Sequence, residues 1–463
     1  MTEYEEMVAR KLAAVPPSGI TGEFRLPPGM FGHQAALTSW ALRRGRSAIF
    51  ADTGLGKMLM ELAWADAVRK HSGQPVLGLC PLAVAAQIAA EGLRFGIEVT
   101  VCRETADVNP GGINVTNYDR AHKFEPDQFG GVFLDESSII KHHDTRTFAA
   151  LSAGFRETPF KLCATATPAP NDWTELGTHA EFLGICTRQE MLAEFFTHDG
   201  GETSVWRLKG HARHIFWQWV CSWGALIRRP SDLGFDDSAY ILPPLHLHEH
   251  TVEVDAPLNG MLFAMEAQTL SERRDARRQS MPDRVAECAA IVNADRSQPW
   301  VVWCDLNAEG DALTKAIDGA VQIAGANSVD TKEQRLRDFS EGRIRVLVSK
   351  PSICGWGLNW QHAARMAFVG VTDSFEAYYQ AVRRCWRFGQ KRDVHIHIFA
   401  SNMEGAVVSN LRRKERDAIA MAESLSAETR DAVMQSVTGS TRATNLYNAA
   451  HRVKVPAFLE SDE

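Results

Sequence analysis

The sequence of 463 residues lacks several features, and each absence excludes a class of protein. No stretch reaches the roughly 18 consecutive apolar residues that a membrane-spanning helix needs. The nine cysteines are odd in number, widely spaced and without a C-x-x-C pair, which excludes a disulfide framework and a structural zinc centre. The acidic start, Met1 to Glu6, lacks the apolar core of a signal peptide. We therefore expect a soluble protein of a reducing cytoplasm.

Net positive charge is also missing. The chain has 50 Lys and Arg against 57 Asp and Glu, a formal charge of −7, so no global positive field draws it to polyanions. Any contact with nucleic acid must be a local patch. The composition is otherwise ordinary, with 45% hydrophobic and 23% charged residues, which excludes collagen-like and largely disordered chains. The length predicts about three domains, or two large ones with a tail.

Short apolar runs rich in β-branched residues alternate with helical patterns in two stretches of the chain. This alternation is typical of parallel sheets built from βαβ units, and the runs are continuously apolar, as strands buried on both faces are. The runs are 47–50, 76–80, 113–115, 132–134 and 160–164 in the first half, and 300–304, 345–349, 366–370 and 394–399 in the second. We predict an α/β protein with two lobes.

The pattern breaks between the two stretches, where tryptophans stand among arginines and a Pro-Pro stop follows. We expect a mostly helical insert there. The predicted divisions are an N-terminal segment (1–24), lobe one (25–185), the helical insert and linker (186–257), lobe two (258–423) and a tail (424–463).

A glycine-bearing turn follows the first predicted strand and precedes a helical pattern. Its residues are Asp52, Thr53, Gly54, Leu55, Gly56, Lys57 and Met58. In such a turn backbone N–H groups converge on phosphate, the helix N-terminus adds positive potential, and Lys57 reaches the β- and γ-phosphates. Ala51 stands where the P-loop pattern has its first glycine. Met58 stands where Ser or Thr gives Mg²⁺ a hydroxyl, and a thioether is a poor ligand for so hard a cation.

Paired carboxylates end a second buried run. Asp135 and Glu136 follow residues 131–134, at the carboxyl edge where α/β sheets bind ligands. Asp135 is expected to hold Mg²⁺ through water, and Glu136 to orient and deprotonate an attacking water. The alternative for the pair is an ordinary acidic start of a helix, and for the turn a glycine-rich connection that binds nothing.

Further strings stand in order along both halves. In the first half they are Phe31-Gly32-His33-Gln34, Cys80-Pro81, Thr116-Asn117-Tyr118, Asp135-Glu136-Ser137-Ser138, and residues 162–168 (LCATATP) with Asn171. In the second they are residues 355–361 (GWGLNWQ) and 380–390 (QAVRRCWRFGQ). Together they resemble the motifs of superfamily 2 helicase-type motors, most of all the Swi/Snf-type translocase branch, over about residues 25–415.

The resemblance implies two RecA-like lobes that hydrolyse ATP with Mg²⁺ at their interface. Gln34 would read adenine, and Gly357 and Gln380 would belong to the nucleotide site. Arg384 and Arg387 would reach the γ-phosphate from lobe two as arginine fingers. The residues expected to contact nucleic acid are Pro81, Thr116, Asn117, Thr165, Ser349 and Asn359.

We expect a monomeric double-stranded DNA translocase of a bacterial or phage-infected cell, where compact members of this branch are common. The sequence departs from the family pattern at Met58, at Ala51, in its short insert, and at Cys385-Trp386, where the family usually has Ala-His. Two alternatives stay open. One is a catalytically weak, nucleotide-gated DNA clamp, and the other is an RNA helicase.

Three histidines, His246, His248 and His250, alternate at a period of two and so share one face of a strand. They could line a metal site. We favour an edge strand with one polar face leading into lobe two, because no cysteine or carboxylate cluster nearby completes a set of ligands.

Overall fold

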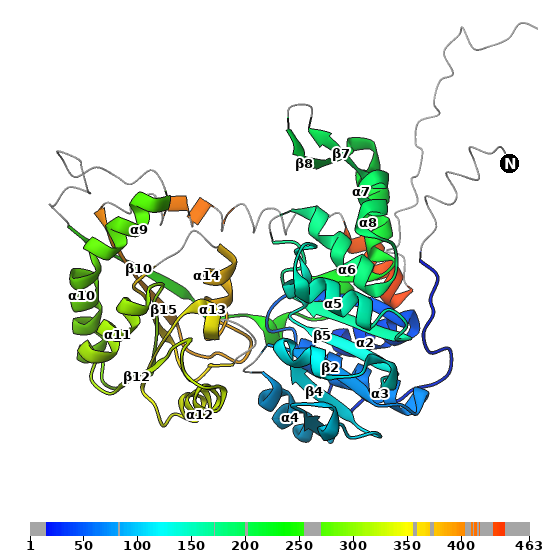
Figure 1. Ribbon diagram of the computed structural model, residues 1–463, viewed down its shortest axis with the longest axis horizontal. Coiled ribbons are helices and arrows are strands. Elements are labelled where there is room, and N and C mark those ends of the chain that lie inside the picture. The colour runs from blue at the N-terminus through cyan, green and yellow to red at the C-terminus, as the bar shows by residue number, and fades with distance from the viewer. Residues whose placement is uncertain are drawn as a thin grey trace, which may run out of the picture.

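Two lobes, each built around one parallel sheet, make up the computed structural model (Figure 1). The structure describes residues 15–81, 84–170, 172–199, 202–253, 270–354, 359–370, 375–402, 409–410, 412–413, 416 and 429–439. Within these ranges, no helix combines the length and the apolar character that crossing a membrane requires. The predicted fold class, two α/β lobes with helices flanking parallel sheets, is confirmed.

Lobe one contains a seven-stranded sheet in the order β3-β4-β2-β5-β6-β1-β9, and all its pairings are parallel. The strands are β1 (Arg46–Ala51), β2 (Val76–Cys80), β3 (Val99–Val101), β4 (Ile113–Asn117), β5 (Gly131–Asp135), β6 (Phe160–Thr165) and β9 (Gly224–Ile227). Strand β6 lies between β1 and β5. The carboxyl ends of β1 and β5, which carry the phosphate loop and the paired acids, therefore lie two strands apart at one edge.

The helices of lobe one cover both faces of this sheet, and its central strands are buried along their whole length. They are α2 (Gly32–Arg44), α3 (Lys57–Ser72), α4 (Ala85–Arg94), α5 (Arg146–Gly154), α6 (Leu176–Leu183), α7 (Arg188–Phe195) and α8 (Arg213–Cys221). Helix α3 begins after Gly56 and ends at Gly73, both in the left-handed region that glycine adopts without a steric penalty. The sequence thus fixes both ends of the helix that carries Lys57.

Lobe two contains a six-stranded parallel sheet in the order β10-β15-β14-β11-β13-β12. The strands are β10 (Leu245–Val252), β11 (Trp300–Trp303), β12 (Ala320–Ile323), β13 (Val346–Ser349), β14 (Arg365–Phe368) and β15 (Val394–Ser401). The helices are α9 (Leu270–Gln279), α10 (Met281–Ala294), α11 (Asn307–Ala316), α12 (Val329–Ser340), α13 (Pro351–Cys354) and α14 (Phe375–Val382).

Besides helices, the segment 186–257 gives a strand to each sheet, and the second of these is the edge strand expected around His246, His248 and His250. Strand β9 pairs with β1 at the edge of lobe one, with Ala48 opposite Gly224. Strand β10 pairs with β15 at the edge of lobe two, with Leu245 opposite Val394. Helices α7 and α8 and the hairpin of β7 (Phe196–Asp199) and β8 (Glu202–Leu208) project from lobe one (Figure 1). Edge strands of the two sheets therefore account for part of this segment.

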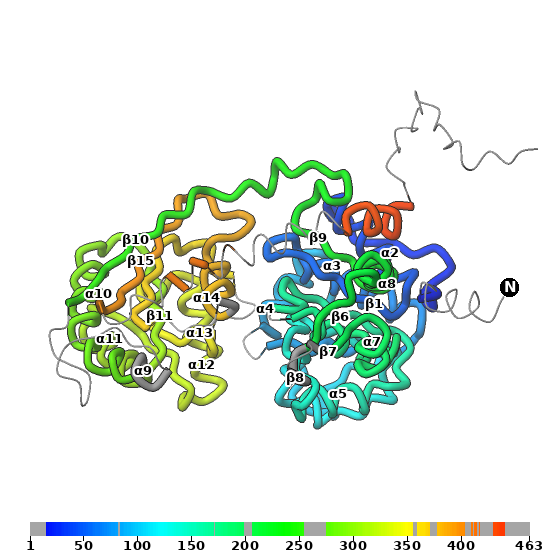
Figure 2. The backbone as a smooth tube through the Cα atoms, turned by 90° about the horizontal axis from the view of Figure 1, so that it is seen from above, coloured from blue at the N-terminus to red at the C-terminus, as the bar shows by residue number. Residues whose placement is uncertain are grey.

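The connection from β9 to β10 crosses from one lobe to the other on one side of the molecule (Figure 2). A late segment of the chain, 429–439, returns to lobe one beside α2 in the same view. It is held there by hydrogen bonds from Trp40 to the Ser436 hydroxyl (2.9 Å) and from Arg430 to the carbonyl of Ser231 (2.9 Å). The chain therefore links the lobes twice.

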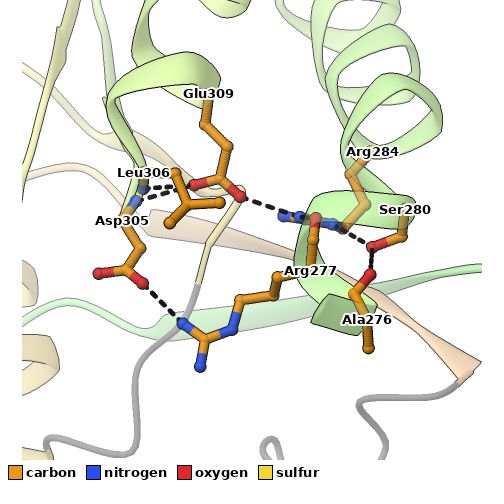
Figure 3. Close-up of polar contacts among 7 residues, drawn as sticks. All are labelled: Ala276, Arg277, Ser280, Arg284, Asp305, Leu306 and Glu309. Carbon is orange, nitrogen blue, oxygen red and sulfur yellow. Dashed lines mark hydrogen bonds and ion pairs between the residues drawn. The ribbon is translucent and has the colours of Figure 1, made fainter. Parts of the chain in front are cut away.

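A buried ion pair anchors the helices of lobe two (Figure 3). Arg284 of α10 and Glu309 of α11 lie 2.9 Å apart, and both side chains are fully buried. Arg284 also donates to the Ser280 hydroxyl (3.0 Å), and Glu309 accepts from the backbone N–H of Asp305 (2.9 Å). Arg277 of α9 pairs with the Asp305 carboxylate at 2.7 Å. The network fixes α9 and α10 against the loop that follows β11.

Candidate active site

A cavity of about 370 Å³ lies between the two lobes, a volume typical of small-molecule sites. Its lobe-one lining includes Gln34, Thr53, Gly54, Gly56, Lys57, Met58, Asp135 and Glu136. Its lobe-two lining includes Asn359, Gln361, Arg384, Arg387, Phe388 and Gly389. Residues predicted for one site from opposite halves of the chain thus meet around one space.

The turn between β1 and α3 forms one wall of this cavity. Gly54 and Gly56 have φ values of 96° and 83°, a region in which a side chain is strained. A Cβ atom on Gly56 would also lie 2.1 Å from the Gln34 side-chain nitrogen, so a larger residue would displace the Gln34 side chain. Lys57 folds back to donate to the carbonyl of Ala51 at 2.8 Å. The turn offers backbone N–H groups, a helix start and an ammonium group to an anion.

Gln34 ties the start of α2 to this turn. Its side chain is buried, accepts from the backbone N–H of Phe31 (3.0 Å) and donates to the carbonyl of Leu55 (3.0 Å). The Phe31 ring meets Tyr240 edge-on, and Tyr240 lies 4.7 Å from Phe388 of lobe two, measured between ring centroids. These three rings line one end of the cavity, where a flat heterocycle could stack. Tyr240 was missed because it stands in a linker without any motif.

The paired acids lie at the carboxyl end of β5, as predicted. Among the residues the structure describes, Glu136 is the one non-glycine residue with a positive φ (52°), and backbone strain of this kind gathers at functional sites. Its carboxylate accepts from the Thr165 hydroxyl at 3.3 Å. Burial and then the charge of Glu136 raise the pKa of Asp135 to about 7, against the opposing effects of Lys57 and Arg384. The acids therefore face both the loop lysine and a lobe-two arginine.

A third acid, Glu61 of α3, lies beside Asp135 and was not predicted. Burial and then Asp135 raise its pKa well above the ordinary value, although Lys57 acts in the opposite direction. The sequence did contain a signal, because Glu61 is the one charged residue in the buried stretch 59–65 of α3.

The predicted arginine fingers follow α14, and both line the cavity. Arg384 donates to the carbonyl (2.9 Å) and the side-chain oxygen (2.8 Å) of Gln380. Burial lowers the pKa of Arg384, while Glu136 and Asp135 across the cavity raise it. Burial and the neighbouring arginines lower the pKa of Arg387 to about 10. Gln380, predicted to touch nucleotide, is buried outside the cavity lining and orients Arg384 instead.

Asp52 also differs from its predicted role in nucleotide binding. Its carboxylate accepts from the Tyr379 hydroxyl (2.7 Å) and from Arg383 (3.1 Å), both in lobe two. Burial raises the pKa of Asp52, but Arg383, Tyr379 and the Thr53 N–H together outweigh it and hold that pKa below its ordinary value. Asp52 is therefore a contact between the lobes.

Three of the residues predicted to contact nucleic acid lie together. Pro81 follows β2, and Thr116 and Asn117 end β4, which pairs with β2 so that Cys80 lies opposite Asn117. The Thr116 hydroxyl is buried and has no hydrogen-bond partner within the described ranges. These residues share one edge of the lobe-one sheet.

The remaining three are placed differently. Thr165 binds Glu136, and the Ser349 hydroxyl donates to the carbonyl of Ile323 (2.9 Å) inside the lobe-two sheet. Asn359 is exposed and lines the cavity between the lobes. The prediction for Gly357 falls outside the described residues.

The histidine face of β10 lies at the edge of the lobe-two sheet, as expected. His248 and His250 each pair with a histidine of β15, His395 and His397, at N···N distances of 3.0 Å. In the part of the chain that the structure describes, no cluster of three or more His, Cys, Asp or Glu side chains is arranged to hold a metal ion.

The donors around the cavity nevertheless suit a hard divalent cation bound together with phosphate. Asp135 and Glu136 offer carboxylate oxygens there, and the hydroxyl of Thr53 in the same lining has no hydrogen-bond partner in the described ranges. Met58 lines the same cavity and offers only a thioether. The lining therefore offers hydroxyl as well as carboxylate oxygens.

Residues 288–389 match the family model of the helicase conserved C-terminal domain, which confirms the resemblance to helicase-type motors in lobe two. Protein p41 of Acyrthosiphon pisum secondary endosymbiont phage 1 is 25% identical over 173 residues, which is 36% of this chain and 35% of that protein. The chain thus spans about a third of the length of this relative. The Sulfolobus solfataricus SWI2/SNF2 ATPase core in complex with dsDNA aligns with 90% of this chain and 98% of its own, at 15% identity and a TM-score of 0.42.

Proposed function

We propose that this chain is an ATP-dependent nucleic-acid motor, and specifically a translocase on double-stranded DNA. The observation that carries the proposal is the cavity between the lobes, which Lys57 and Glu136 line from one side and Arg384 and Arg387 from the other. Groups of both signs from two lobes suit a reaction in which negative charge shifts along a phosphate chain.

In the proposed reaction, Lys57 and the N–H groups of its turn bind the β- and γ-phosphates. Asp135 would hold Mg²⁺ through water, and the cation would supply positive charge that offsets the charge of the phosphates. Glu136 orients the attacking water and accepts its proton. Arg384 and Arg387 stabilise the charge that develops on the γ-phosphate, so the site is complete only when the lobes are closed.

Movement follows from the same arrangement. Hydrolysis removes the charge that joins the two lobes, and lobe two is then free to separate. If both lobes hold a phosphate backbone, repeated closure moves the protein along it. The edge formed by Pro81, Thr116 and Asn117 is the proposed lobe-one contact, which would bind backbone without reading sequence.

The test is the rate of ATP hydrolysis by the full chain with duplex DNA, single-stranded DNA or RNA. We expect duplex DNA to accelerate hydrolysis most, and Lys57→Ala to abolish it. Greater acceleration by RNA would establish the RNA helicase alternative. No acceleration by either form of DNA, or an unchanged rate in Lys57→Ala, would overturn the proposal.

A nucleotide-gated clamp is the second candidate, and Met58 is the observation that favours it. A clamp predicts negligible hydrolysis by the native chain and a large gain in Met58→Thr, which restores a hydroxyl ligand. A motor predicts substantial native hydrolysis that Met58→Thr changes little.

A further inference from the structure

Tyr118 is a buried tyrosine to which the proposed reaction gives no role. It follows Thr116 and Asn117 at the end of β4. Its hydroxyl donates to the backbone carbonyl of Asp135, at the end of β5, over a distance of 2.7 Å. Strand β2 lies between β4 and β5 in the sheet, so the tyrosine side chain reaches past an intervening strand. The contact therefore joins two strand ends that the sheet itself does not pair.

The acceptor of this hydrogen bond belongs to the peptide unit that leads into Glu136. A peptide unit is planar, so a bond that fixes its carbonyl also fixes its N–H and restricts φ of the next residue. At Glu136 that φ is 52°, a strained value for a residue other than glycine, which persists only where the surrounding structure holds it. The Thr165 hydroxyl holds the carboxylate of Glu136 at 3.3 Å. Tyr118 thus holds the backbone of the residue whose side chain Thr165 holds.

On its other side, Tyr118 adjoins the edge that we propose as the nucleic-acid contact of lobe one. Asn117 precedes it directly and caps the 3₁₀ turn Tyr118–Lys123, where its side chain accepts from the backbone N–H of Arg120 at 3.1 Å. The Thr116 hydroxyl has no hydrogen-bond partner in the described ranges, so this strand end still has a donor to offer. A phosphate backbone bound at Thr116 or Asn117 would therefore restrain the chain next to Tyr118.

We propose that Tyr118 is a positioning residue that couples nucleic-acid binding at the end of β4 to the reactive conformation of Glu136. Bound nucleic acid restrains the backbone at Asn117 and so holds the Tyr118 hydroxyl on the Asp135 carbonyl. Glu136 then keeps the orientation in which it accepts a proton from the attacking water. The inference rests on the proposed function, because it takes Glu136 as the base and this edge as the nucleic-acid contact. It goes beyond that function by naming the side chain through which nucleic acid accelerates hydrolysis.

The experiment uses Tyr118→Phe in the full chain, which removes the hydroxyl and keeps the ring. Steady-state ATP hydrolysis is measured with and without saturating duplex DNA, and the affinity for the duplex is measured by fluorescence anisotropy. We expect the acceleration by DNA to fall roughly 5-fold or more through kcat, from the lower end of the usual coupling between two sites upward. The KM for ATP should stay the same, because Tyr118 lies outside the cavity lining. The affinity for DNA should change little, because Thr116 and Asn117 are retained.

The matched control is Thr178→Val on α6 of the same lobe. It also removes a buried hydroxyl that donates to a backbone carbonyl, that of Glu175 at 2.8 Å, and it should leave the acceleration by DNA unchanged. Native acceleration in Tyr118→Phe would overturn the inference and leave the proposed function intact. An equal loss of rate with and without DNA would also overturn it, because Tyr118 would then hold Glu136 independently of nucleic acid. A native chain that DNA does not accelerate would instead contradict the proposed function, and the inference with it.

A double-mutant cycle with Glu136→Gln separates the proposed role from a general loss of folded protein, because misfolding would lower the rate in both backgrounds. If Tyr118 acts through Glu136, its hydroxyl should contribute nothing once the base is gone. Adding Tyr118→Phe to Glu136→Gln should then change the single-turnover rate with DNA by less than about twofold. A further loss as large as that in the native background would show that the two residues act independently and would overturn the inference.

Discussion

The two lobes bury charge of opposite sign where they face each other. In lobe one the pKa values of Asp135 and Glu61 are raised, and in lobe two those of Arg384 and Arg387 are lowered, in every case chiefly by burial. Each lobe alone therefore disfavours the charged form of its own groups. The comparison teaches that neither half of the site is electrostatically satisfied until the other half and a charged ligand complete it.

Removal of a guanidinium group from lobe two is the most direct test of whether the two halves of the site depend on each other. We expect Arg387→Ala to slow ATP hydrolysis by roughly 10³- to 10⁵-fold, because the role proposed for Arg387 is that of an arginine finger, which contributes that much in phosphoryl-transfer enzymes. Nucleotide binding should change far less. The measurement is steady-state hydrolysis beside a binding titration.

The control for this variant is Arg392→Ala. Arg392 is an exposed lobe-two arginine that donates to Gln298 outside the cavity. Its loss should leave hydrolysis near the native rate. A rate for Arg387→Ala within tenfold of native would mean that lobe two contributes little to the reaction.

Lobe two also contains a buried ion pair, Arg284 with Glu309, whose role is structural (Figure 3). We expect Glu309→Gln to lower the free energy of unfolding by about 3–5 kcal/mol, because it leaves the buried Arg284 without its counter-charge. Replacing both partners, as Arg284→Met with Glu309→Leu, should recover much of this loss. Chemical denaturation followed by tryptophan fluorescence provides the measurement, and Asp318→Asn in the exposed pair with Arg296 is the control.

The sequence predicted well what depends on local pattern. Continuous apolar runs identified the central strands of both sheets, and strand–turn–helix spacing brought Lys57 and the paired acids to one edge. The resemblance of residues 380–390 to a family motif pointed to Arg384 and Arg387, and both line the cavity.

The sequence could not predict contacts that depend on how the lobes meet. Asp52 stands in the phosphate loop but binds Arg383 of the other lobe, and Gln380 turns inward to orient Arg384. Tyr240, in the connection between β9 and β10, also lines the cavity. The edge strand β9 was also missed, because its four residues closely follow the helical pattern of α8.

Titration of His179 should have a smaller effect, a pH-dependent change in the unfolding free energy of lobe one. Burial lowers the pKa of His179 to about 4, against the effects of its neighbours Glu175 and Ser137, while the unfolded value is 6.5. The unfolded chain therefore binds the proton more strongly, and stability falls as the pH falls from about 6.5 to 4. The full loss is about 3 kcal/mol. Asp135 acts in the opposite direction, because its raised pKa favours proton uptake by the folded lobe below about pH 7.

His179→Gln isolates the histidine contribution. The difference in unfolding free energy between native and variant chains should be constant above pH 6.5 and shrink toward pH 4. A difference that does not vary over this range would mean that His179 titrates normally in lobe one.

The smallest expected effect is on closure of the lobes. It can be tested by comparing a buried contact between the lobes with an exposed one. Asp52 accepts hydrogen bonds from Tyr379 and Arg383 in a largely buried setting, so Asp52→Asn should weaken the closed form by about 1.5–3 kcal/mol, the range for hydrogen bonds to charged groups. Arg103 and Asp330 also bridge the lobes at 3.3 Å, but both side chains are mostly exposed, at 63% and 78%. Since exposed pairs contribute little, Asp330→Asn should hardly change the open population that single-molecule energy transfer between dyes on the two lobes reports. Equal shifts in the two variants would mean that the buried contact does not hold the lobes together, and closure would then depend on the ligand alone.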